Sequence, residues 1–153
     1  RWELAEILIP DVRFVDINIF WRDDRWWLIA TDLCGDVGDP STNLVIYYSS
    51  DLRHGTWHPH AKNPVICDAG VGRNAGMVFE EGGSLRVSQS QGFDFYGKSV
   101  GFGEIIKLDP DEFQYNLKHR VTADFRKDAL GIHTFSYRGG LLVFDWVKRE
   151  HIV

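Results

Sequence analysis

The feature that most constrains the fold is a strand–turn–strand pattern that occurs three times along the chain. In the first copy, Val15, Ile17 and Ile19 recur at every second position, which is the period of a β-strand. The polar residues 22–25 interrupt the apolar run as a hairpin loop does, and residues 26–30 resume it with aromatic and β-branched side chains. We therefore predict a β-hairpin whose second strand is buried on both faces.

Two later segments, residues 72–89 and 131–145, repeat this hairpin pattern. Phe20, Phe79 and Phe135 fall at equivalent positions, roughly 55–60 residues apart, a spacing in the range of a four-stranded propeller blade with long loops. The repeats predict an all-β fold made of four-stranded antiparallel blades, each blade beginning with a copy of the hairpin.

The repeats also set the expected boundaries. We predict one propeller-like domain over residues 1–153, with blade one at about 14–64, blade two at about 72–122 and the start of a third at about 131–153. The strands are expected near 14–21, 26–31, 43–49, 56–58, 75–80, 84–89, 98–107 and 113–121, and residues 2–9 as an outer strand of a preceding blade. A closed propeller usually has about four to eight blades. Three arrangements stay open: a fragment of a longer protein, which the domain prediction favours, a ring completed by a second copy, or an open stack of sheets.

Composition excludes several classes of function. The net charge of −5 argues against a nucleic-acid-binding surface, which would be basic. No apolar run has the length of a membrane span and no signal-peptide pattern opens the chain, so we expect a cytoplasmic location. The chain begins at Arg1, and we expect its natural N-terminus to lie upstream. The two cysteines, Cys34 and Cys67, are interpreted as free thiols rather than as a disulfide.

The first strand of each propeller blade lines the central channel, so candidate catalytic residues are sought there. Asp16 lies four residues before Phe20 and is the best candidate for a catalytic carboxylate; the alternative is a carboxylate that only accepts hydrogen bonds from backbone amides. His133, two residues before Phe135, is the second catalytic candidate. Its alternative is an imidazole hydrogen-bonded to a neighbouring blade.

Three further residues are predicted to bind substrate. Arg73 offers a planar fork of donors that suits a carboxylate or a phosphate, although a salt bridge with Asp16 or Asp68 is the alternative. Gln89 and Tyr96 supply an amide and an aromatic face, a combination that commonly holds sugars. The competing interpretation is that residues 96–97 are merely a loop closing on the next strand.

No metal and no cofactor are expected. His58 and His60 would share one face of a strand, but a third ligand at suitable spacing is not evident. The glycine-rich spacings that bind phosphates are absent.

The order and spacing of short motifs resemble a known family. The domain is similar to the five-bladed propeller related to the N-terminal region of glucosamine inositolphosphorylceramide transferases, and distantly to the furanosidase propellers that include arabinanases and fructosidases. The motifs that carry the resemblance are Val15-Asp16, Phe20, Arg25-Trp26-Trp27-Leu28, Tyr47, Ser49, Asp51-Leu52, Trp57, Pro59-His60, Asn63-Pro64, Arg73, Ala75-Gly76, Gln89, Tyr96-Gly97 and His133-Thr134-Phe135.

This resemblance implies a five-bladed propeller, present here in part, that recognises or processes carbohydrate within a sugar-modifying protein. The furanosidase propellers use three carboxylates, one from each of the first three blades. The positions equivalent to Asp16 are Ala75 and Gly131, so this trio is not retained within the segment. Whether the domain is an enzyme is left uncertain by the sequence.

Three functions follow, of which the first is preferred. They are a catalytically degenerate module that binds a sugar or sugar phosphate, an active glycoside hydrolase or glycosyltransferase component with further carboxylates outside this segment, and a scaffold for protein interactions. The expected partners are the sugar ligand and a fused catalytic domain or second copy, with no nucleic acid and no membrane span.

Overall fold

The computed structural model describes residues 1–33, 42–77, 85–92 and 96–148. The regular structure in these ranges is almost entirely β-strand, arranged in antiparallel sheets, with one short 3-10 turn, η2 (Ala123–Phe125). No sheet closes on itself within these ranges. The all-β class and the antiparallel sheets agree with the prediction, whereas the five-bladed closure stays a prediction.

The first sheet has strand order β1-β2-β3-β4, with a fifth strand, β5, paired to β3. Its strands are β1 (Phe14–Arg22), β2 (Arg25–Asp32), β3 (Asn43–Ser49), β4 (His58–Pro59) and β5 (Ile66–Cys67). Asp23 and Asp24 form the predicted tight turn with φ of 51° and 56°, because aspartate tolerates the left-handed conformation that a two-residue hairpin requires. Strand β2 is buried along most of its length, as predicted, and β3 is buried to a similar extent.

The second sheet is a four-stranded meander in the order β6-β7-β8-β9. Its strands are β6 (Arg73–Asn74), β7 (Leu85–Ser90), β8 (Ser99–Leu108) and β9 (Phe113–Thr122). The predicted strand at 75–80 is wrong at its start, because the ladder with β7 lies at residues 73–74; residues 78–80 lie outside the described ranges. Gly76, at φ +149°, instead forms a bridge to Phe135 in the next part of the chain.

The third part contains two short antiparallel pairs. Strand β11 (Phe135–Arg138) forms a hairpin with β12 (Leu141–Phe144), and β10 (Ala129–Gly131) pairs with β13 (Val147–Lys148). The turn at Gly139-Gly140 has positive φ at both residues, which is the geometry expected for a two-residue hairpin loop. The predicted hairpin segment starts at residue 131, but its first strand starts only at Phe135, because residues 132–134 are not in a strand.

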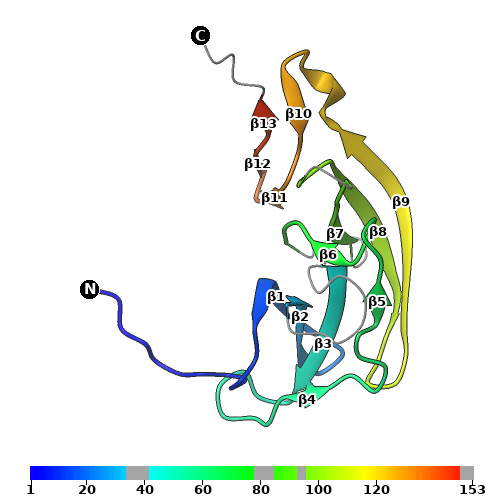
Figure 1. Ribbon diagram of the computed structural model, residues 1–153. Coiled ribbons are helices and arrows are strands. Elements are labelled where there is room, and N and C mark those ends of the chain that lie inside the picture. The colour runs from blue at the N-terminus through cyan, green and yellow to red at the C-terminus, as the bar shows by residue number, and fades with distance from the viewer. Residues whose placement is uncertain (34–41, 78–84, 93–95, 149–153) are drawn as a thin grey trace.

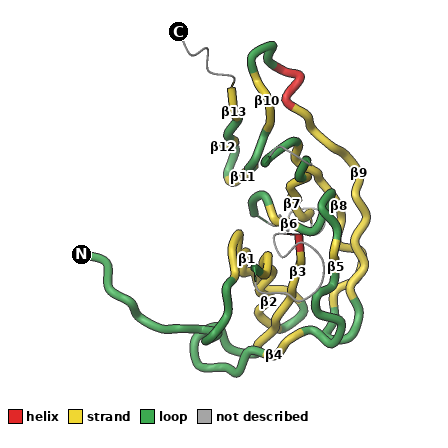
Figure 2. Tube along the Cα trace, viewed as in Figure 1, coloured by secondary structure: helices red, strands yellow, loops and turns green. Residues whose placement is uncertain are grey.

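Figure 1 shows the sheets following one another along a curved path, and Figure 2 shows the same strands traced as a tube. Strands β1, β6 and β11 lie along the inner side of the curve, and β4, β5 and β9 lie along its outer side. The inner side is therefore where segments from all three parts of the chain approach one another.

Apolar side chains from neighbouring sheets pack into common clusters. The largest joins the first sheet to the second, where Trp27 and Ile29 share a cluster with Ile105 and Leu108. A smaller cluster around Val87, Val100 and Ile132 joins the second sheet to the third part. Burial of these surfaces is the main term that fixes the sheets relative to one another, at roughly 25 cal/mol per Å² of apolar area.

Residues 2–9 do not form the predicted outer strand. They run without strand structure; the first residues project from the body of the domain, where Trp2 and Leu4 are almost fully exposed, whereas Ile9 packs against Leu28 and its neighbours. A strand needs a neighbour for its backbone hydrogen bonds, and no described strand pairs with this segment.

The structure tests two further expectations only in part, because each involves a residue outside the described ranges. Phe20 is buried in the first cluster and Phe135 packs against the second, but Phe79 lies outside the described ranges, so their equivalence stays a prediction. Cys67 is an exposed free thiol, and Cys34 lies outside those ranges.

In the part of the chain that the structure describes, no helix has the length and apolar character that a membrane span requires.

Candidate functional site

Five polar residues form a continuous chain of contacts, referred to below as the polar cluster. Arg73 Nε donates to Asp16 Oδ2 at 2.8 Å, and the guanidinium carbon lies 5.0 Å from the centroid of the Tyr96 ring. The Tyr96 hydroxyl lies 2.7 Å from His133 Nε2, and His133 Nδ1 lies 2.7 Å from Asp145 Oδ2. Four of the five residues predicted from the sequence are thus brought together from segments more than 100 residues apart.

Asp16 occupies a β-bulge in β1. The register of β1 against β2 shifts between Val15 and Asn18, and Asp16 has a φ of 54°, which is unusual for a residue other than glycine. Bulges are common beside functional sites because they redirect one side chain out of the regular alternation. This bulge directs the Asp16 carboxylate to Arg73 of the next sheet, and the Asp16 carbonyl accepts a hydrogen bond from Asn74 Nδ2 at 2.9 Å.

Arg73 is held at one side of its guanidinium only. Its side chain is 13% exposed, and its Nε is paired with the Asp16 carboxylate. No described residue accepts a hydrogen bond from its two terminal nitrogens. Of the two salt-bridge partners considered from the sequence, Asp16 and Asp68, the structure selects Asp16.

Arg86 holds Asn74, which in turn donates to the Asp16 carbonyl. This arginine was not identified from the sequence. Its fully buried guanidinium donates to Asn74 Oδ1 at 2.8 Å and to the carbonyls of Val71 and Gly72 at 2.6 Å each. Burial lowers the pKa of Arg86 to about 10, so the group is still a cation at neutral pH. No sequence signal separates this arginine from an ordinary strand residue with an exposed side chain.

Tyr96 and His133 approach closely because the residue after Tyr96 is Gly97, which has no side chain to separate the two segments. Gly97 has a φ of +73°, and a Cβ built on it would lie 3.1 Å from His133 Cβ. The loop that carries Tyr96 therefore packs directly on residues 132–133. Tyr96 still has substantial exposure, so part of its side chain is accessible from solvent.

Asp145 is the member of the polar cluster that the sequence prediction missed. Its Oδ1 accepts hydrogen bonds from the backbone amides of His133 and Thr134, at 3.1 and 2.7 Å. Burial raises the pKa of the Asp145 carboxyl, but the hydrogen bonds from the His133 ring and the Thr134 amide outweigh it, so the pKa lies below its ordinary value. An aspartate directly after the apolar run 141–144, in the same predicted hairpin as His133, was the available signal.

Gln89, the fifth predicted residue, lies behind the polar cluster. It is directly opposite Arg73 in the β6–β7 ladder, so the two side chains start on the same face of the sheet. Gln89 is fully buried, and neither atom of its side-chain amide has a hydrogen-bond partner among the described residues. Its assignment to substrate binding stays a prediction.

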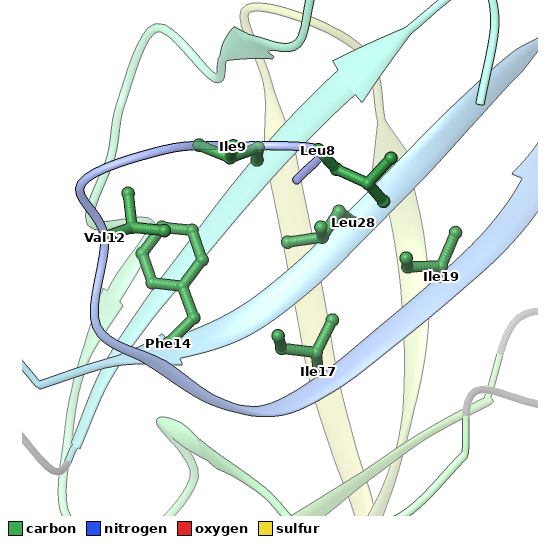
Figure 3. Close-up of a pocket in the computed structure, with 7 residues that line it drawn as sticks. All are labelled: Leu8, Ile9, Val12, Phe14, Ile17, Ile19 and Leu28. Carbon is green, nitrogen blue, oxygen red and sulfur yellow. The ribbon is translucent and has the colours of Figure 1, made fainter. Parts of the chain in front are cut away.

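An apolar pocket lies beside β1, apart from the polar cluster. The N-terminal segment folds over β1 and β2 there and encloses an apolar pocket of about 270 Å³ (Figure 3). The pocket is lined by Leu8, Ile9, Val12, Phe14, Ile17, Ile19 and Leu28. Because this lining offers no polar side chain, the pocket is unsuited to the hydroxyl groups of a sugar.

The polar cluster combines a cation, two carboxylates, an imidazole and a phenol at an accessible edge. Such a set can bind an anion, donate hydrogen bonds to hydroxyl groups and move protons. No group of three or more potential metal ligands occurs among the residues that the structure describes. His60 is buried, and its Nδ1 accepts a hydrogen bond from the Lys62 amide, whereas His58 packs against Tyr48.

We expect Asp16→Asn to lower the free energy of unfolding by about 1–2 kcal/mol, because it removes the charge that Arg73 pairs with in a partly buried position. The matched control is Asp24→Asn. Asp24 has nearly the same left-handed φ, 56° against 54°, but is exposed in a turn. Urea denaturation followed by tryptophan fluorescence measures both variants, and equal effects would show that the ion pair contributes nothing.

These features define the class of protein as an all-β domain with a polar site on the inner edge of successive antiparallel sheets. The chain belongs to the family described as glucosamine inositolphosphorylceramide transferase 1, N-terminal, which matches residues 1–135. Four members of the polar cluster lie within the matched range, and Asp145 lies beyond it.

A curated relative is glucosamine inositolphosphorylceramide transferase 1 of Arabidopsis thaliana. It is 35% identical over 116 residues, which cover 74% of this chain and 15% of the relative. The chain thus spans only about 15% of the length of this transferase, whose name indicates a context of sugar modification. No solved structure matches the chain.

Proposed function

We propose that this domain binds an anionic carbohydrate, a sugar phosphate or a uronic acid, at the polar cluster. One observation carries the proposal: Asp16 fixes Arg73 through Nε, while the terminal nitrogens have no acceptor among the described residues and lie beside the exposed Tyr96 ring. An arginine held in this way presents two parallel donors to a carboxylate or phosphate, and the aromatic face supports a sugar ring.

The family supports the same ligand class. The Arabidopsis relative is named for an inositolphosphorylceramide, and an inositol phosphate is a polyol that carries a phosphate. If an N-terminal domain binds such a head group, it would hold the head group near the catalytic part of a longer transferase. This fused arrangement is part of the proposal.

We further propose that the curved row of sheets is part of a five-bladed propeller. Two observations support this interpretation. Strands β1, β6 and β11 follow one another on the inner side of the curve (Figure 1). The last part of the chain exposes apolar side chains that a further sheet would cover. These side chains are Leu141, Leu142, Val143, Phe144, Trp146 and Val147.

Isothermal titration calorimetry with myo-inositol 1-phosphate, glucuronic acid and neutral myo-inositol tests the proposed ligand class. We expect saturable binding of at least one anionic probe, weaker binding of neutral myo-inositol, and a loss of about 10-fold or more in affinity for Arg73→Met. The control is Arg138→Met, which removes an exposed arginine at the end of β11.

Binding that Arg73→Met and Arg138→Met weaken equally would contradict a specific role for Arg73. The absence of binding for all three probes, with a folded wild-type domain, would overturn the proposed function. Retained binding of a protein partner by Arg73→Met would then favour the scaffold hypothesis, for which the exposed apolar surface of β12 and β13 is the candidate region.

A further inference from the structure

Three members of the polar cluster, Tyr96, His133 and Asp145, form a hydrogen-bonded triad of their own. The two ring nitrogens of His133 have different partners, each at 2.7 Å: Nδ1 contacts a carboxylate oxygen of Asp145, and Nε2 contacts the Tyr96 hydroxyl. A third residue orients the imidazole, and the imidazole contacts a hydroxyl group. This is the order of contacts found in catalytic triads, with a phenol in place of serine.

The geometry fixes the tautomer of His133. An ionised carboxylate can only accept hydrogen bonds, so the short contact with Asp145 requires the proton to be on Nδ1. The amides of His133 and Thr134 also donate to Asp145, which keeps this carboxyl in its ionised form and in place. In the neutral imidazole, Nε2 then carries the lone pair and accepts the proton of the Tyr96 hydroxyl.

A cation lies beside the Tyr96 ring, and the phenol is accessible from solvent. The Arg73 guanidinium lies 5.0 Å from the ring centroid and supplies a nearby positive charge. Tyr96 is 49% exposed, so a ligand bound at Arg73 can reach the phenol. Neither feature is needed if the triad serves only to hold two loops together.

We propose that Tyr96, His133 and Asp145 form a proton relay whose working end is the Tyr96 hydroxyl, and that it accepts a proton from a hydroxyl group of a bound carbohydrate. The Tyr96 O–H bond breaks as a bond between His133 Nε2 and the proton forms, leaving an imidazolium beside Asp145 and a phenolate beside Arg73. The phenolate then takes one proton from the ligand hydroxyl. The balance is one proton moved from ligand to His133, with no change of oxidation state.

The substrate class rests on the proposed function, but the relay does not. Its test therefore uses probes that need no carbohydrate, so that failure of the relay and failure of sugar binding are separate results.

The first measurement is the tautomer of His133, read from long-range ¹H–¹⁵N correlation spectra of the full chain at alkaline pH, where imidazoles are neutral. We expect the wild type to carry its proton on Nδ1. In Asp145→Asn the amide group faces the ring in place of an acceptor, so we expect the proton to move to Nε2. A wild-type imidazole protonated on Nε2 would overturn the relay.

The second measurement is the rate of O-acetylation by N-acetylimidazole, followed by peptide mass spectrometry. Tyr137 is an internal reference, since its exposure of 43% is close to the 49% of Tyr96. We expect Tyr96 to react about 10-fold faster or more, and Asp145→Asn to remove most of this difference. Equal rates in the wild type, a comparison that needs no variant, would overturn the proposal.

Discussion

Replacing Arg86 with leucine is expected to lower the free energy of unfolding by about 3–5 kcal/mol, the largest effect of any single side chain considered in this domain. Arg86 is completely buried and donates to three acceptors: the side chain of Asn74 and the carbonyls of Val71 and Gly72. Leucine would leave all three acceptors without this donor, and each unsatisfied buried group costs about 1–3 kcal/mol.

Two effects oppose each other in this variant. Leucine removes a buried cation whose described hydrogen-bond partners are all neutral, which by itself is favourable. The loss of three hydrogen bonds is larger, because the guanidinium also sets Asn74 in the position from which it holds the Asp16 carbonyl. We therefore expect Arg86→Leu to weaken the bulge of β1 as well as the loop before β6.

The control for Arg86→Leu is Arg53→Leu at an exposed turn position, where we expect a change within about 0.5 kcal/mol. Urea denaturation with tryptophan fluorescence measures both. A loss below about 1 kcal/mol for Arg86→Leu would show that removal of the buried charge offsets the three hydrogen bonds.

Gly76→Ala is the second substitution with a large expected effect, about 2–4 kcal/mol of destabilisation. A Cβ at this position would lie 1.8 Å from the carbonyl oxygen of Phe135, and Gly76 has a φ of +149°. The clash is with backbone, so side-chain rotation cannot relieve it. The strand around Phe135 must move away, which breaks the 2.7 Å hydrogen bond from the Phe135 amide to the Ala75 carbonyl.

Gly139→Ala is the control for Gly76→Ala, because it introduces the backbone strain of a positive φ without a steric clash. Gly139 also has a positive φ, +57°, but a Cβ there would meet nothing within 4 Å. We expect this control to cost about 1–2 kcal/mol, the penalty of the left-handed conformation alone. Equal losses for the two variants would contradict a close backbone contact at Gly76. Hydrogen exchange offers a local check, since only Gly76→Ala should expose the Phe135 amide.

Local features of the chain could be predicted from the sequence because short-range patterns determine them. The hairpin with Asp23-Asp24 at its turn and the hairpin with Gly139-Gly140 follow from alternation and turn residues. The buried strands β2 and β3 follow from continuous apolar runs. These patterns depend on neighbours within a few residues, so they can be recognised in the sequence without knowledge of the fold.

The site is predictable in part: Asp16, Arg73 and His133 follow from their positions relative to the repeated hairpins, and Tyr96 follows from its aromatic character. The sequence gives no measure of which loops meet, so Asp145 was missed although it lies 12 residues from His133. The left-handed conformation of Asp16 and the burial of Arg86 depend on the packing of one sheet on the next. Residues 2–9 were taken for a strand because alternation does not show whether a pairing strand exists.

The central claim is that the polar cluster is the ligand site of the domain. Amide chemical-shift perturbation on titration with myo-inositol 1-phosphate tests it most directly. The predicted result is a saturable change concentrated at residues 16, 73, 96, 133 and 145. Saturable changes confined to the apolar pocket at β1, or no saturable change in a folded domain, would contradict the claim.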